Sequence, residues 1–311
     1  MTGRNESLAV IIPVFNEGGS IRKNLDEIRG VFARDGIPCR FMLVDDGSTD
    51  HTWSELQALA GEFEEVSAVR FARNFGKEAA IFAGINSIDA DRYLIMDSDL
   101  QHPPECAKDM LALMEKEQAD IIDGVKESRG RESVKYRFYA KCFYRLLRLV
   151  TGLDLCGSSD FKLLNRRVAE HLLEMKESRL FFRGLVDWVG FKRVSFSFAV
   201  GERTHGFTRF STRKLVKLAF DAFFSFTDRP LHLALFFGVF FLLAAAGLGL
   251  WMLISSLSGR YTADFSVVIL LLLVIGAVIL ISLGTVGVYI SRIYDEVKGR
   301  PRYIVSERIE K

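Results

Sequence analysis

The stretch LIMDSDLQHPPE, Leu94 to Glu105, decides the fold of this 311-residue chain. An apolar run with the composition of a buried strand ends in Asp97 and Asp99, with one serine between them. Two carboxylates this close repel each other, and without a compensating cation the pKa of each would rise. The arrangement is explained if a divalent metal ion lies between the carboxylates, or if both face water.

The first 126 residues repeat this pattern of apolar strand, polar end and helix. Strands are predicted at SLAVIIPVF, RFMLVDD, VSAVRF, RYLIMD and ADIIDGV, with helical spacing between them. In the first helix Ile21, Leu25, Ile28 and Phe32 share one face, and Gly36 follows as a stop. Such alternation predicts an α/β fold with a mostly parallel sheet and helices on both faces.

Ligands bind to sheets of this kind at the carboxyl ends of the strands. The polar clusters PVFNE, VDDGSTD, RNFGKE and DSDLQ should therefore meet in one crevice. Beyond residue 126 the pattern is weaker. SSDFKLLNRR is expected to lead into a helix, and FKRVSFSFAVGER alternates like one long strand or two short exposed ones.

The C-terminal third contains two long apolar runs. No charged residue occurs in 230–259 or in 265–290, and a bilayer span needs about 20 apolar residues. The runs predict a transmembrane hairpin with spans at 231–257 and 265–290, although buried soluble helices can be equally apolar. Basic residues flank the pair on both sides, which places both termini in the cytosol. Residues 211–229 are expected to form an amphipathic interfacial helix, and 292–311 a cytosolic basic tail; an ordinary core-packing helix is the alternative for 211–229.

Composition and missing motifs exclude several functions. The formal net charge is +2, so the overall charge of the chain implies no general attraction to nucleic acid. The sequence has neither GxGxxG nor GxxxxGK[ST], which argues against a dinucleotide enzyme and a P-loop ATPase.

The strand ends carry residues suited to a diphosphate. Asp97, Asp99 and Gln101 offer oxygen donors from alternate positions, a set that fits Mg²⁺ or Mn²⁺ with phosphate oxygens and water completing the shell. Asp45 and Asp46 can accept from a ribose hydroxyl or a base N–H, while Ser48 or Asp50 caps the next helix. The remaining candidates are Pro13, which fixes the strand exit, Glu17, which can reach the sugar of a nucleotide, and Arg73 and Lys77, which either face phosphates or are solvated.

Seven segments follow one another along the chain: IPVFNE, VDDGSTDHT, RNFGKEAAIFAGI, MDSDLQHPPE, SSDFKLLNRR, FFRGLVDWVGF and YISRIYDEVKGRPRY. Together and in this order, they resemble family 2 glycosyltransferases of the polyprenyl-phosphate branch. The resemblance covers nearly the whole chain. It implies a GT-A fold, a nucleoside diphosphate sugar donor, a divalent metal and inversion at the anomeric carbon. By position it assigns Asp97, Asp99 and Gln101 to the metal and diphosphate site, and Pro13, Phe15, Glu17, Asp45 and Asp46 to the nucleotide pocket. Ser98, between the two aspartates, is a further candidate for the nucleotide-sugar site.

The acceptor decides which other residues matter. A lipid phosphate is already ionised and needs cations to position it, for which the candidates are Lys126, Arg129, Arg131, Arg203 and Arg209. Relatives usually carry arginine near Lys126 and lysine near Arg209, and the two residue types are not equivalent at a phosphate. A hydroxyl acceptor would need a general base, and Asp160 is the candidate, with a structural hydrogen-bonding role as the alternative.

The sequence therefore predicts a glycosyltransferase that moves a sugar, from a UDP-sugar in preference to a GDP-sugar, onto undecaprenyl phosphate. Its place would be the cytosolic face of the bacterial inner membrane, with the catalytic domain over 1–210. Three alternatives stay open: a hydroxyl-acceptor transferase of polysaccharide synthesis, although QxxRW is missing, a membrane-anchored nucleotide-sugar binder without catalysis, and a flippase subunit. Gly284 and Gly287 leave a homo-oligomer open.

Overall fold

The computed structural model describes residues 7–126, 158–175, 177, 181–199 and 265–310, together with twelve single positions between 236 and 258 (236, 239–241, 243, 246, 247, 250, 251, 254, 257 and 258). The chain divides into two compact units. One contains the sheet, its helices and the C-terminal residues from 301 onward, and the other contains the apolar C-terminal helix. Arg129, Arg131, Arg203, Arg209 and the predicted interfacial helix lie outside the described residues.

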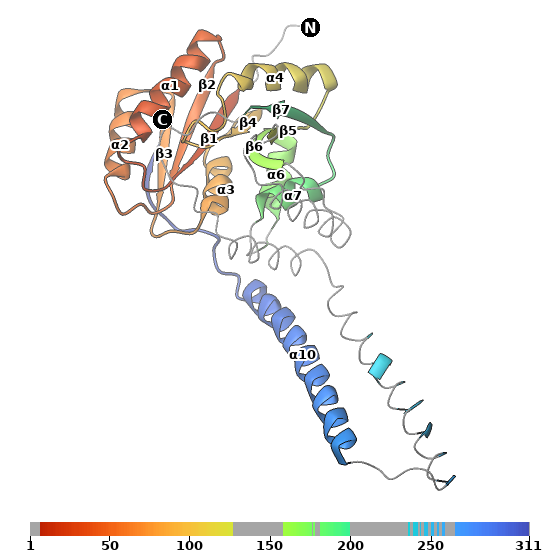
Figure 1. Ribbon diagram of the computed structural model, residues 1–311. Helices are drawn as coiled ribbons and strands as arrows, with labels where there is room; N and C mark the ends of the chain where they lie inside the picture. Colours follow the sequence, from red (N-terminus) through yellow and green to blue (C-terminus); the bar gives the residue numbers. More distant parts are fainter. Residues whose placement is uncertain are drawn as a thin grey trace. The chain divides into compact units, whose positions relative to one another are not determined.

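An eight-stranded sheet organises the first unit (Figure 1). Its order is β7-β5-β6-β4-β1-β2-β3-β8. The strands are β1 (Leu8–Val14), β2 (Cys39–Asp45), β3 (Val66–Phe71), β4 (Arg92–Ile95), β5 (Ile121–Lys126), β6 (Ser158–Asn165), β7 (Arg193–Phe198) and β8 (Val305–Ile309). The pairs β1–β2, β1–β4, β2–β3 and β5–β7 are parallel, whereas β6 and β8 run antiparallel to their neighbours. The predicted mostly parallel α/β sheet is confirmed.

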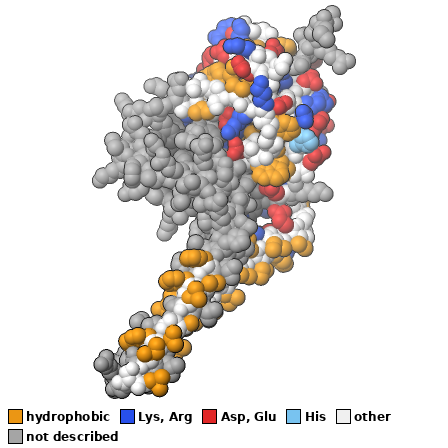
Figure 2. All heavy atoms as spheres, turned by 90° about the vertical axis from the view of Figure 1, so that its right-hand side faces the viewer, with side chains coloured by type: hydrophobic (Ala, Val, Ile, Leu, Met, Phe, Trp, Pro, Cys, Tyr) orange, Lys and Arg blue, Asp and Glu red, His pale blue; other side chains and the backbone are white. Residues whose placement is uncertain are grey.

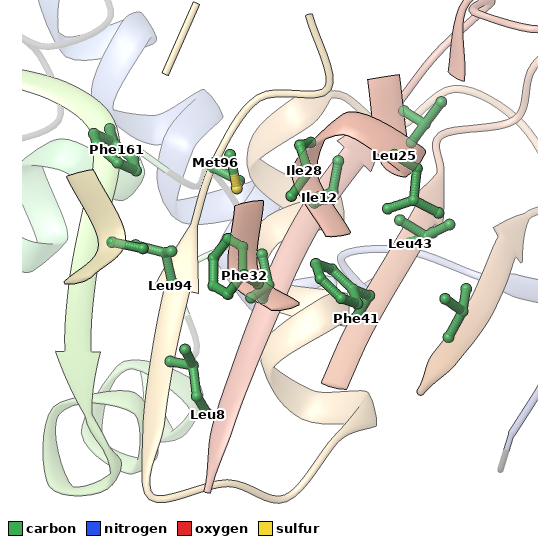
Figure 3. Close-up of a cluster of buried hydrophobic side chains, with 14 of the residues drawn as sticks. Leu8, Ile12, Leu25, Ile28, Phe32, Phe41, Leu43, Leu94, Met96 and Phe161 are labelled. Atoms are coloured by element: carbon green, nitrogen blue, oxygen red, sulfur yellow. The ribbon is translucent and has the colours of Figure 1, made fainter. Parts of the chain in front are cut away.

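Helices cover both faces of the sheet. They are α1 (Ile21–Arg34), α2 (Thr52–Glu62) and α4 (Cys106–Glu117) on one side, and α3 (Lys77–Ser87), α6 (Arg166–Glu174) and α7 (Phe182–Trp188) on the other. Successive strand residues point to opposite faces, so β1 places Ile12 in one core and Ile11 in the other. Figure 3 shows the first core, where the predicted face of α1, including Leu25 and Phe32, packs toward Ile12 and Phe41.

Two strands differ from the sequence prediction. Residues 158–165, expected only to lead into a helix, form β6, and the helix begins after it at Arg166. Residues 305–309 lie in the segment expected to be a basic tail, yet they form β8 at the edge of the sheet beside β3. Both strands depend on pairing with distant segments, which a local pattern does not report.

The second unit contains α10 (Phe265–Val297). It begins where the second span was predicted and continues seven residues beyond the expected end. Residues 274–297 are long and apolar enough to cross a membrane, with a mean hydropathy of 2.2 in their most apolar window. Large apolar side chains such as Leu280 and Ile290 are exposed, and the corresponding face in Figure 2 is mostly hydrophobic. Within the first predicted span, described positions such as Phe240 and Trp251 are helical and exposed.

Candidate active site

The ends of four parallel strands meet around one cavity of about 320 Å³. It is lined by residues at the ends of β1, β2, β3 and β4 and in the segments that follow them: Pro13, Val14, Phe15, Glu17, Asp46, Asn74, Gly76, Lys77, Asp97, Ser98 and Asp99. These are the four polar clusters that the sequence places at strand ends, so the structure brings them together in one crevice.

The two aspartates after β2 have different contacts. Asp45 is fully buried, and its Oδ1 accepts from the Ser48 backbone N–H at 2.9 Å. Asp46 lines the cavity and accepts from the backbone N–H groups of Phe75 at 2.7 Å and Gly76 at 2.9 Å. Burial raises the pKa of Asp46, and these backbone bonds oppose the rise. Asp45 therefore stabilises the turn that follows it in sequence. Asp46 instead fixes the loop between β3 and α3 in position beside the cavity.

Glu17 lies between the β1 and β4 ends. The Ser98 hydroxyl donates to its Oε1 at 2.8 Å. Among the described residues, no group donates a hydrogen bond to its buried Oε2. Burial raises the pKa of Glu17 to about 7, with the nearby charges of Asp99 and Asp97 adding to the rise. This carboxyl is thus poised to accept from, or donate to, a ligand in the cavity.

Asp97 and Asp99 both face the cavity, and neighbours hold each of them. The Asp97 backbone N–H donates to Nδ1 of His102 at 3.0 Å. Burial lowers the pKa of His102 to about 4 despite the charge of Asp97, so this imidazole is neutral near pH 7. Gln101 is hydrogen-bonded to Asp99 through both its backbone and its side chain. Its backbone N–H and its Nε2 donate to the two oxygens of Asp99, at 3.1 and 2.6 Å.

Asp160 joins the crevice because β6 is antiparallel. Ile95 of β4 lies opposite Lys162, so the first residues of β6 lie at the edge where β4 ends. Lys77 Nζ lies 2.5 Å from Oδ1 of Asp97 and 2.7 Å from Oδ2 of Asp160. Arg183 of α7 adds a two-point contact to Asp160, at 2.7 and 3.1 Å.

These contacts set the charge of Asp160. Burial alone would raise its pKa, but the charges and hydrogen bonds of Lys77 and Arg183 outweigh burial and hold the pKa well below its usual range. The same competition between burial and Lys77, with His102 contributing, lowers the pKa of Asp97. Asp160 is therefore ionised and already occupied by two cations, which makes it a weak proton acceptor.

This cavity lies within a segment that matches a known family. Residues 9–173 match the family model described as glycosyl transferase family 2. The chain belongs to glycosyl transferase family 2. It is therefore a glycosyltransferase, and the matched segment includes every cavity-lining residue and Asp160.

Relatives of this transferase match over its whole length. The uncharacterized glycosyltransferase YkcC of Bacillus subtilis is 33% identical over 309 residues, which cover 98% of this chain and 94% of that protein. The SfII prophage-derived bactoprenol glucosyl transferase of Shigella flexneri is 33% identical over 304 residues, covering 96% and 97%. Among solved structures, the mannosyltransferase PcManGT from Pyrobaculum calidifontis is 18% identical with a TM-score of 0.48, covering 73% of this chain and 61% of that one.

Arg73 and Lys126 are two of the predicted cations. Unlike Lys77, they are not among the residues that line the cavity. Arg73 lies over the Phe75 ring, 4.2 Å from its centroid, and is exposed. Lys126 ends β5 and is half-buried.

Two residues that contact the site were not named among the candidates from sequence, Arg183 and His102. Arg183 lies within FFRGLVDWVGF, a segment matched only as part of the resemblance, and it meets Asp160 because α7 packs beside β6. His102 lies in the loop between β4 and α4, where it is 1% exposed and stacks on Phe161 of β6. Its position five residues after Asp97 was the available signal.

Proposed function

We propose that this family 2 transferase moves one sugar from a nucleoside diphosphate sugar, preferably a UDP-sugar, onto undecaprenyl phosphate with inversion at the anomeric carbon. The observation that carries the proposal is the single cavity in which Asp97 and Asp99 meet Glu17 and Asp46 at the carboxyl edge of the sheet. The product, a polyprenyl-phosphate-linked sugar, would serve modification of glycans or lipids.

The donor side of the proposal rests on the β1 and β2 ends. Glu17 has a buried oxygen without a hydrogen-bond donor among the described residues, which suits a ribose hydroxyl or a base N–H. Pro13 and the 43% exposed Phe15 supply apolar surface for the nucleotide. Asp45, Asp46 and Ser98 hold these loops in place, and Arg73 stays a candidate for the phosphates.

Asp97 and Asp99 would hold Mg²⁺ or Mn²⁺. The donor set fits, because two carboxylates that face an open cavity leave room for diphosphate oxygens and water, the usual shell of such ions. Gln101 orients Asp99 and remains a predicted third ligand. A bound metal ion would stabilise the negative charge that develops on the leaving diphosphate. Lys77 keeps Asp97 ionised and so ready for the cation.

The acceptor side favours a phosphate over a hydroxyl. A hydroxyl would need a general base, and Lys77 and Arg183 leave Asp160 a weak one. A phosphate monoester needs only positioning by cations, for which Lys126 remains a candidate, as do Arg129, Arg131, Arg203 and Arg209 beyond the described residues. Relatives of nearly equal length that are named bactoprenol glucosyl transferases support the lipid acceptor.

A lipid acceptor also requires a membrane, and α10 is long and apolar enough to cross one. We propose that 231–257 and 265–290 form a transmembrane hairpin in the bacterial inner membrane, with 211–229 at the interface. The catalytic domain, 1–210, and both termini would be cytosolic, as the flanking basic residues predict.

The test is sugar transfer by the detergent-purified chain with Mn²⁺, undecaprenyl phosphate and a panel of UDP- and GDP-sugars. Release of nucleoside diphosphate should require the lipid and should be abolished in Asp99→Ala. Decanol in place of the lipid tests a hydroxyl acceptor. Nucleotide binding without lipid-dependent release for any donor would contradict the proposed acceptor, and release with decanol alone would favour the hydroxyl alternative.

A further inference from the structure

The C-terminal tail belongs to the catalytic unit, although it follows the apolar helix in sequence. After α10 ends at Val297, residues 305–309 form β8 and pair antiparallel with β3 (Figure 1). The Ala72 backbone N–H donates to the Ile304 carbonyl at 2.9 Å, and the Ser306 hydroxyl donates to the Arg70 carbonyl at 3.1 Å. In this register Glu307 lies opposite Arg70.

Glu307 orients Arg70 from the outer strand. Its carboxylate accepts from Trp53 Nε1 at 2.9 Å and from a terminal nitrogen of Arg70 at 3.1 Å. The other nitrogens of Arg70 face the loop after β2, where one donates to the Ser48 carbonyl at 3.2 Å and Nε lies 3.4 Å from Oδ2 of Asp45. The planar guanidinium thus joins the tail to the loop that carries Asp45 and Asp46.

Arg70 matters because Asp45 has few other partners. Asp45 is fully buried, and among the described residues no group makes a hydrogen bond to its Oδ2 within the usual geometry. The Arg70 charge therefore balances this oxygen. The same loop supports the cavity wall, since the Asn16 backbone N–H donates to the Ser48 hydroxyl at 2.9 Å, beside Glu17.

A second contact links the tail to Asp46. The Tyr303 ring stacks on Phe71 with centroids 5.1 Å apart, and Phe71 meets Phe75 edge-on at 5.7 Å. Phe75 in turn donates its backbone N–H to Asp46, which lines the cavity. Two independent routes, one ionic and one aromatic, therefore run from the tail to the aspartates after β2.

We propose that the C-terminal tail is a positioning element of the nucleotide site, with Glu307 acting through Arg70 on Asp45 and Tyr303 acting through Phe71 and Phe75 on Asp46. The inference rests on the proposed function, because it takes the cavity to be the site of the nucleoside diphosphate. Glu307 and Tyr303 touch no ligand themselves. They fix the loops that do, so their loss weakens donor binding and leaves the transfer step intact.

The closing experiment compares Glu307→Gln with Glu310→Gln in the full chain. Both variants remove one negative charge from the same exposed strand end, but Glu310 pairs with Arg308 of the tail itself at 2.5 Å, whereas Glu307 pairs with Arg70 of β3. For Glu307→Gln we expect a donor KM raised about three- to tenfold, with kcat and the lipid KM within twofold of wild type. Glu310→Gln should match wild type in all three. Tyr303→Ala tests the aromatic route and should likewise raise the donor KM.

Equilibrium binding of UDP and GDP with Mn²⁺ separates this inference from the proposed function. Weaker nucleotide binding in Glu307→Gln but not in Glu310→Gln supports the inference, even if wild type transfers no sugar to the lipid. Unchanged binding in Glu307→Gln, or an equal loss in both variants, overturns it. A fall in kcat with the donor KM unchanged would also overturn it, and wild-type chain that binds neither nucleotide would overturn both proposals.

Discussion

The two halves of the crevice hold their carboxylates in different ways. In the proposed nucleotide half, at the ends of β1, β2 and β3, the cavity-lining Asp46 accepts from backbone N–H groups at 2.7 and 2.9 Å. In the transfer half, at the ends of β4 and β6, Asp97 and Asp160 share the side chain of Lys77 at 2.5 and 2.7 Å.

The difference has a physical consequence. A backbone N–H fixes a loop without adding a full charge, so it shapes the nucleotide half and leaves the pKa of Asp46 raised by burial. A shared cation sets ionisation as well as position, so the transfer half keeps Asp97 and Asp160 charged. Substitutions in the transfer half should therefore reduce turnover, and those in the nucleotide half should reduce donor affinity.

The largest effect is expected for Lys77→Met. It removes the cation that Asp97 and Asp160 share, so the pKa of both carboxyls should rise and Asp97 should lose its fixed position. We expect kcat to fall about 10²-fold, the effect of misplacing a reacting group by about 1 Å. Lys77→Arg keeps the charge and should retain more activity. Steady-state kinetics at pH 7 measures kcat for both variants. A kcat within twofold of wild type for Lys77→Met would contradict the claim that the shared cation controls the transfer half.

A smaller effect is expected for Asp46→Ala in the nucleotide half. The change leaves the backbone N–H groups of Phe75 and Gly76 without their acceptor, which costs about 1–3 kcal/mol for a buried group. The donor KM should rise about tenfold, with a lesser change in kcat. Asp46→Asn keeps one acceptor oxygen and should recover part of the affinity. Titrations of the donor at saturating lipid measure its KM and kcat in both variants. A loss confined to kcat would contradict the expectation that the nucleotide half governs donor affinity.

The predictable part of the fold was local. Five parallel strands and the face of α1 follow from apolar runs and helical spacing, because each run carries its own signal. β6 did not, since it carries Asp160 and Lys162 on one side, and the burial of Lys162 depends on an ion pair with Asp123 of β5 that a local pattern does not report. β8 did not either, because its place depends on β3, 237 residues away at the Arg70–Glu307 contact.

The same division applies to the site. The polar clusters that line the cavity were predicted to meet, because each lies at the end of a strand and parallel strands end at one edge. The contacts that set their charge were not predicted, because Lys77 and Asp160 are 83 residues apart and Arg183 belongs to α7, which follows β6 and α6 in the sequence. Sequence pattern thus indicates which groups face a ligand, whereas packing decides which cations set their charge.

Gly47→Ala should disturb the nucleotide half through its backbone. Gly47 has φ +69°, and a Cβ there would lie 2.4 Å from the Arg73 carbonyl carbon and 2.7 Å from the Asn74 nitrogen. Because both atoms are backbone, the loop between β3 and α3 must move, at a cost of about 1–3 kcal/mol in the free energy of unfolding. Gly30→Ala, in the middle of α1 with open space around it, is the control and should stabilise by about 0.5–1 kcal/mol. Urea unfolding in detergent measures the unfolding midpoint of both variants. Equal midpoints would mean that the loop between β3 and α3 moves at no cost in stability.

The smallest effect should be the same in both halves. Burial, the largest cause, raises the pKa of Glu17 in the nucleotide half and of Glu78 in the transfer half to about 7, from an ordinary value of 4.5. The folded chain therefore holds these protons more tightly than the unfolded chain. The resulting stability is fully present below about pH 4.5 and is lost as pH rises through 7, by about 1–3 kcal/mol for each group.

Glu17→Gln and Glu78→Gln should each flatten this decline between pH 5 and pH 8, because glutamine is neutral throughout and can still accept from Ser98 or from the Phe182 backbone N–H. Glu27→Gln, on the exposed face of α1, removes the same charge outside the cavity and is the matched control. Unfolding midpoints at the two pH values measure the slopes. Burial is the largest cause of both shifts, so both substitutions should flatten the slope. A slope flattened by Glu17→Gln but not by Glu78→Gln would show that Lys77 and Arg183 offset the effect of burial on Glu78.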